Sequence, residues 1–171
     1  MSERENAFVF FGPQTLVGPQ LQAGDKAPEF TLTNGKMQQV TLGDFAGRPL
    51  LLSVAPSLDT GVCSRQGARF NQEAAALGEK ANVLMVTADL PYAQGRWCGA
   101  NDATNIQALS DYRDMSFGTA YGTYIKSYRL DSRAVFVVDA DGIVRYAEYV
   151  PTIAEEPNYD AAMSALRAAT G

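Results

Sequence analysis

The chain has 171 residues, of which 14 are basic and 19 acidic, giving a net charge of −5. This length is typical of one folded unit, so we expect a single domain spanning residues 1–171. An acidic chain lacks the basic surface that nucleic acids and anionic membranes require, and we expect neither as a partner. The sequence contains no histidine and only two cysteines. These counts exclude Ser-His-Asp and Cys-His catalysis, His-ligated metals and four-thiolate clusters, so we expect no metal and no cofactor.

The N-terminal segment is polar and carries acidic residues, unlike a secretory signal. The longest apolar runs are far shorter than the roughly 20 residues that cross a bilayer. We therefore expect a cytoplasmic protein. In that reducing compartment a pair of cysteines is more often redox-active or catalytic than a structural bridge.

The first part of the chain alternates short apolar runs with turn residues. Residues 8–17 are interrupted by Gly12-Pro13, which predicts a β-hairpin. Residues 30–42 contain Asn34-Gly35, a pair that favours the positive-φ backbone of a tight turn, and they predict a second hairpin.

Longer apolar runs and helical patterns follow. Continuous apolar or alternating runs predict strands at 50–55, 83–87, 133–138 and 143–150. Helical patterns cover 63–79, a segment that starts at Pro91, 115–121 and 158–169. A terminal hairpin and helix after a βαβ unit is the thioredoxin-like arrangement. We predict an α/β thioredoxin-like fold, with a central mixed sheet flanked by helices and an added N-terminal β-hairpin.

Cys63 is the strongest candidate for chemistry because it follows a buried strand and begins a predicted helix. The unpaired N–H groups of a helix N-terminus stabilise a thiolate, which is the nucleophilic form of cysteine. Thr60 either caps this helix, or directs its hydroxyl at the sulfur, or does both. Pro56 can shield the sulfur from water. Because the chain has no histidine, the thiolate needs another positive partner, and Arg133 can be that cation. Read singly, each of the four has an ordinary structural explanation, such as a buried packing cysteine or a strand terminator.

Three segments together resemble the bacterial thiol peroxidases, a branch of the peroxiredoxin family. Residues 56–63 (PSLDTGVC) carry the active-site pattern of Pro, Thr and Cys. Residues 88–99 (ADLPYAQGRWCG) resemble the segment around the resolving cysteine, and residues 132–139 (SRAVFVVD) resemble the strand with the active-site arginine. The resemblance extends over nearly the whole chain. Trp97 stands where the family more often has Phe.

The resemblance implies a thioredoxin-dependent peroxidase with an antioxidant role, acting on hydrogen peroxide and organic hydroperoxides. Cys63 would be oxidised to a sulfenic acid, while Thr60 and Arg133 stabilise the reacting atoms and Pro56 keeps water from the sulfur. Cys98 would then form an intramolecular disulfide with Cys63, which thioredoxin reduces. The family also implies a homodimer.

Both cysteines fall near helix termini on separate predicted helices. If the reduced protein holds their Cα atoms farther apart than a disulfide allows, the first turn after Thr60 and the 91–98 helix must unwind locally to form it. Two other functions stay open. A protein disulfide oxidoreductase would favour a Cys-x-x-Cys pair, which the sequence lacks. A redox sensor of the thioredoxin fold would share these residues with a peroxidase and differ from it in rate.

Overall fold

A computed structural model describes all residues 1–171. Eleven strands form two sheets, and four α-helices pack around them. The strands are β1 Glu3–Val9, β2 Pro13–Val17, β3 Thr31–Thr33, β4 Gln39–Thr41, β5 Leu50–Val54, β6 Asn82–Thr87, β7 Gln107–Ser110, β8 Tyr124–Ile125, β9 Leu130–Asp131, β10 Ala134–Val138 and β11 Val144–Tyr149. The helices are α1 Gly61–Ala75, α2 Pro91–Ala100, α3 Ser116–Tyr121 and α4 Tyr159–Thr170, with short 3₁₀ turns at Leu42–Phe45 and Gly78–Lys80.

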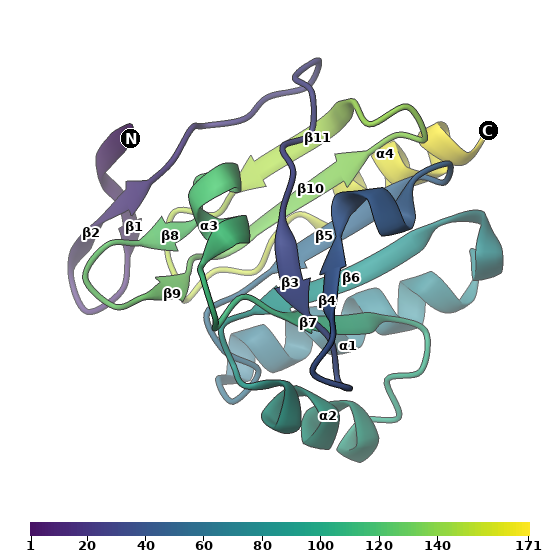
Figure 1. Cartoon of the computed structure of the whole chain (residues 1–171), viewed down its shortest axis with the longest axis horizontal. Helices are drawn as coiled ribbons and strands as arrows, with labels where there is room; N and C mark the ends of the chain where they lie inside the picture. The colour runs from purple at the N-terminus through teal and green to yellow at the C-terminus, as the bar shows by residue number, and fades with distance from the viewer.

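The central sheet has seven strands in the order β11-β10-β5-β6-β7-β3-β4 (Figure 1). β5, β6 and β7 run parallel, whereas β10, β11, β3 and β4 pair in antiparallel fashion. The β5 and β10 strands are buried along their whole length, as expected for strands covered on both faces. The predicted thioredoxin-like α/β fold with a mixed central sheet is confirmed.

Helices cover both faces of this sheet. Side chains of α1 and α4 pack with Leu51, Val83 and Val135 on one face. The opposite face packs against α3 and the segment around Phe30. The alternation of side chains along β5 therefore places Leu51 toward one pair of helices and Leu52 toward α3.

The predicted N-terminal hairpin is present as β1 and β2, and it belongs to a second sheet in the order β1-β2-β8-β9. This four-stranded sheet lies at one end of the molecule, on the left in Figure 1. The short strands β7, β8 and β9 carry no strong pattern of their own, and the sequence did not predict them. Residues 151–153 join the second sheet through Val9, whose N–H donates to Pro151 O at 2.8 Å.

Two local predictions differ from the structure. The first helix begins at Gly61 and ends at Ala75, and a 3₁₀ turn follows, because Gly78 takes a φ of 54° that an α-helix does not allow. The β3–β4 hairpin is real, but its positive φ falls on Met37 and not on Asn34-Gly35. The Asn34 side chain instead closes a longer connection by accepting the N–H groups of Lys36 and Gln38.

Candidate active site

Cys63 lies in the first turn of α1, where Thr60 is the N-cap. The Thr60 hydroxyl accepts the Cys63 N–H at 3.4 Å and donates to Ser57 O at 3.2 Å. Both bonds of the hydroxyl are thus to the backbone, which favours the capping reading of Thr60 over direct contact with the sulfur. The sulfur sits in the partial positive field of the helix N-terminus, a position that stabilises a thiolate.

Arg133 comes from the residue before β10 and has no exposed surface. Its Nη2 lies 3.4 Å from Cys63 Sγ and donates to Ile153 O at 2.8 Å. The predicted pairing of Cys63 with Arg133 is therefore present in the geometry. Arg133 Nε is buried and has no hydrogen-bond partner.

Gln66 is a further member of the site that the sequence did not reveal. It lies one turn after Cys63 on α1 and is fully buried. Its Oε1 accepts from Arg133 Nη1 at 2.7 Å. Its Nε2 donates to Ser53 Oγ at 2.8 Å and to Val54 O at 3.1 Å. Gln66 thus links the Arg133 guanidinium to the end of β5. In the sequence, the only sign that Gln66 belongs to the site was its position one helical turn after Cys63.

The loop that leads into Cys63 is held by Asp89, from the connection after β6. The Asp89 carboxylate accepts Ser57 Oγ at 2.7 Å and the Leu58 N–H at 2.8 Å. Pro56 is buried where this loop leaves β5. The start of α1 is thereby tied to the connection that leads into α2.

Cys98 lies on α2 as a half-buried free thiol, and Cys63 is also free. The two cysteines are not close to one another. Burial raises the pKa of the Cys98 thiol, which keeps it protonated near neutral pH. The side chain next to it, Trp97, packs in the same apolar cluster as Cys63. Of the two sulfurs, only Cys63 lies beside a cation.

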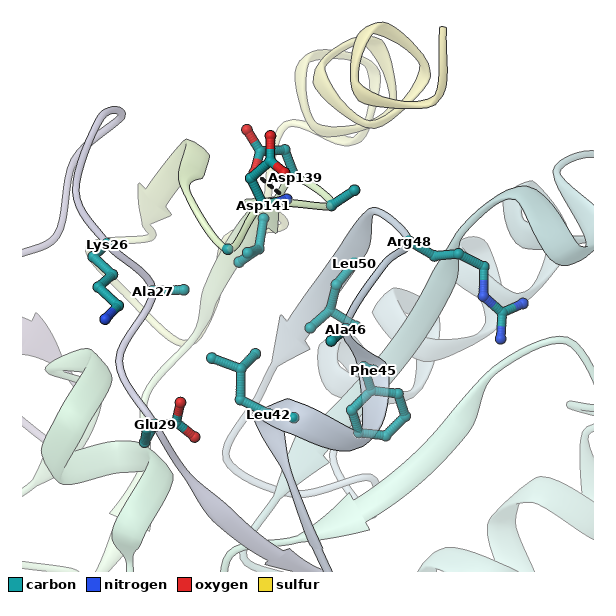
Figure 2. A pocket seen from close by; sticks show the side chains of 14 residues that line it. Lys26, Ala27, Glu29, Leu42, Phe45, Ala46, Arg48, Leu50, Asp139 and Asp141 are labelled. Atoms are coloured by element: carbon teal, nitrogen blue, oxygen red, sulfur yellow. Dashed lines mark hydrogen bonds between the residues drawn. The ribbon is translucent and has the colours of Figure 1, made fainter.

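A cavity of about 220 Å³ lies at the other end of the sheet, beside the paired residues Leu50 of β5 and Val138 of β10 (Figure 2). Charged and apolar side chains surround it, among them Lys26, Glu29 and Leu42. Asp139 at its rim already accepts the N–H groups of Asp141 and Ile143. Neither cysteine lines this cavity.

Two other features bear on the class of site. No group of three or more His, Cys, Asp and Glu side chains is arranged to hold a metal ion. None of the helices has the length and apolar character needed to cross a membrane.

Comparisons with known proteins identify the family of the chain. The family model described as Redoxin matches residues 22–163. Thiol peroxidase from Bacillus subtilis (strain 168) is 51% identical over 157 residues, covering 92% of this chain and 93% of that protein. Thiol peroxidase from Streptococcus pneumoniae (strain R6) is 50% identical over 161 residues, covering 94% of this chain and 98% of that protein. A peroxiredoxin-like protein from Aquifex aeolicus superposes with a TM-score of 0.88 at 35% identity, covering 96% of each chain.

The chain belongs to the redoxin family. Within that family it is a thiol peroxidase, an enzyme of the peroxiredoxin type, because about half of its residues are identical to those of the two thiol peroxidases over more than nine-tenths of the chain. The resemblance seen in the three sequence segments is thus confirmed.

Proposed function

We propose that this enzyme reduces hydrogen peroxide and organic hydroperoxides, with Cys63 as the peroxidatic cysteine. The observation that carries the proposal is the buried contact of 3.4 Å between Arg133 Nη2 and Cys63 Sγ at a helix N-terminus. A permanent cation and oriented N–H groups at the sulfur are the surroundings in which reactive cysteines are found.

The first step is attack of the Cys63 thiolate on the terminal oxygen of the peroxide. The O–O bond breaks, a sulfur–oxygen bond forms, and the other oxygen leaves as an alkoxide or hydroxide that water protonates. Charge moves from sulfur to the leaving oxygen during this step. Arg133 stabilises that charge through its guanidinium, whose Nη2 lies 3.4 Å from Cys63 Sγ. Thr60 orients the turn, and Pro56 helps to exclude water.

The second step uses Cys98 as the resolving cysteine. Its thiol attacks the Cys63 sulfenic acid, forming an intramolecular disulfide and releasing one water molecule. Thioredoxin then reduces the disulfide through its own dithiol, which becomes oxidised in exchange. Because Cys98 is half-buried with a raised pKa, it reacts after the surrounding structure opens.

The cellular setting follows from this cycle. Its product is a disulfide that must be reduced after every turnover, which suits a cytoplasm supplied with reduced thioredoxin. The proposal further includes an antioxidant role for the enzyme and its assembly as a homodimer. Sedimentation velocity of the reduced protein tests the homodimer directly.

The deciding experiment couples peroxide consumption to NADPH oxidation through thioredoxin and thioredoxin reductase. The wild-type enzyme is compared with Cys63→Ser and Cys98→Ser. We expect rapid turnover for the wild type and none for either variant. Cys98→Ser should still consume one peroxide per chain and yield one sulfenic acid, detected by mass spectrometry after trapping with dimedone.

The outcomes separate this function from its competitors. If Cys63 reacts with peroxide no faster than free cysteine does, the peroxidase assignment is wrong and a redox sensor becomes the better explanation. If wild type reduces or oxidises disulfides of other proteins efficiently but not peroxide, the enzyme is a disulfide oxidoreductase. If Cys98→Ser sustains thioredoxin-dependent turnover, the resolving role of Cys98 is wrong.

A further inference from the structure

A single side-chain hydrogen bond joins the two helices that carry the cysteines. Trp97 Nε1 on α2 donates to Ser64 Oγ on α1 at 2.9 Å. Ser64 directly follows Cys63, and Trp97 directly precedes Cys98. The bond therefore connects the immediate neighbours of the two sulfurs.

The indole ring of Trp97 also packs directly against Gly67 of α1. A Cβ added at Gly67 would lie 2.8 Å from Cη2 of Trp97 and 3.2 Å from its Cζ2. Any larger residue at this position would displace the ring. The side chain of Trp97 is accordingly buried, with 7% of its surface exposed, in a cluster with Cys63, Leu58 and Met85. We call Trp97, Ser64 and Gly67 the Trp97 latch.

This arrangement opposes disulfide formation. A disulfide needs its two Cα atoms within roughly 4.4–6.8 Å, and these cysteines are not close to one another. For Cys98 to reach Cys63, α1, α2 or both must move or unwind locally at the cysteines. Because Ser64 adjoins Cys63 and Trp97 adjoins Cys98, such a movement acts directly on the hydrogen bond between Trp97 and Ser64.

We propose that the Trp97 latch sets the rate at which the oxidised Cys63 is resolved by Cys98, with Trp97 and Ser64 as positioning residues. This inference rests on the proposed function. The step concerned is attack of the Cys98 thiol on the Cys63 sulfenic acid, which forms the sulfur–sulfur bond and releases water. Peroxide attack on Cys63 precedes opening and does not depend on the latch.

The test measures the two steps separately in a single turnover with one equivalent of hydrogen peroxide. Trp97→Phe keeps an aromatic ring without the N–H donor, and Ser64→Ala removes the acceptor. Tyr92→Phe, an exposed aromatic substitution on the same helix, is the matched control. Samples are quenched with N-ethylmaleimide, and intact masses distinguish reduced, sulfenic and disulfide chains. Peroxide loss gives the rate of the first step.

Losing one net hydrogen bond predicts roughly two- to tenfold faster disulfide formation in both variants, with the first step unchanged. The double variant should be no faster than the faster single one, because both remove the same bond. At high peroxide both variants should also form less sulfinic acid, since the sulfenic acid persists for less time. Tyr92→Phe should match wild type in every readout.

Two results overturn the inference while leaving the proposed function intact. One is a disulfide that forms at the wild-type rate in both variants. The other is an equal acceleration in Tyr92→Phe. A wild-type enzyme that forms no Cys63–Cys98 disulfide at all would instead contradict the proposed function itself. Trp97, the only tryptophan in the chain, supplies an internal check, because its fluorescence should change at the rate of disulfide formation.

Discussion

Arg133 illustrates why a charge alone does not define this site. Its two terminal nitrogens reach Gln66, Cys63 and Ile153 at once, which requires the planar fork of a guanidinium. Arg133→Lys retains the charge but cannot make the three contacts. We expect kcat/KM for peroxide to fall by roughly 10²–10³-fold, as when one charge-stabilising donor is lost. Arg145→Lys, on an exposed arginine, is the control and should be neutral. Near wild-type kcat/KM in Arg133→Lys would show that a positive charge at this position is sufficient for the reaction with peroxide.

Gln66 acts through Arg133 and does not touch the sulfur in any hydrogen bond. Gln66→Leu would leave Arg133 Nη1 without its acceptor in a buried environment. We expect the free energy of unfolding to fall by about 1–3 kcal/mol and kcat/KM to fall at least tenfold. Gln66→Glu keeps an acceptor and should recover part of the activity.

The matched control for Gln66→Leu is Gln72→Leu, the same substitution at an exposed position of α1. It should leave both stability and kcat/KM unchanged. Stopped-flow peroxide reaction and urea unfolding measure the two quantities. Loss of stability without loss of kcat/KM in Gln66→Leu would reduce Gln66 to a packing role.

At the scale of elements, two buried carboxyl groups hold α3 to the strand before Arg133. Asp111 accepts the N–H groups of Phe117 and Gly118, and Asp131 accepts the Thr123 hydroxyl at 2.8 Å. A Cβ at Gly118 would lie against an oxygen of each carboxyl, so the two groups converge on one point. Burial raises the pKa of Asp131 well above its usual value, and burial also raises that of Asp111. Burial and the nearby charge of Asp111 therefore both favour the protonated form of Asp131.

The raised pKa values of this pair make the stability of the protein depend on pH. Because the folded-state pKa values lie above the unfolded ones, the pair's contribution to stability is fully present below about pH 4 and is lost as pH rises through the folded values. Asp131→Asn mimics the protonated acid. We expect it to exceed wild type in unfolding free energy by about 1–3 kcal/mol at pH 8, with the difference shrinking toward pH 4.

Urea unfolding at pH 4, 6 and 8 measures this difference, with Asp114→Asn, an exposed neighbour, as the control. A difference that stays constant with pH would mean that Asp131 is ionised throughout.

At the scale of the whole molecule, the sequence predicted what depends on side-chain type and periodicity. The thiol at a helix start, its Thr cap and the arginine at a strand start were found because each follows from a local pattern. Gln66 was missed because a buried glutamine in a helix looks like any polar helix residue. Ile153 was missed for a deeper reason: its carbonyl carries no sequence signal, and only the tertiary fold brings it to Arg133.

Ile153 also connects the second sheet to the active site. Its N–H donates to Val9 O at 3.1 Å, and its side chain packs against the cluster of Phe8, Leu16 and Ile125. Val9 in turn donates its own N–H to Pro151 O. The N-terminal hairpin thus holds in place the Ile153 carbonyl, which accepts a hydrogen bond from Arg133. The hairpin itself forms no hydrogen bond with Cys63.

This connection predicts a remote effect on catalysis. Val9→Pro removes the N–H that binds Pro151 while keeping an apolar side chain of similar size. We expect kcat/KM for peroxide to fall roughly three- to tenfold as the 151–153 segment loosens, in line with the loss of about one hydrogen bond. Phe11→Ala, at the exposed tip of the same hairpin, should leave kcat/KM unchanged. Amide exchange at Ile153 should rise in Val9→Pro alone, and unchanged catalysis despite that rise would show that Arg133 keeps its position without the hairpin.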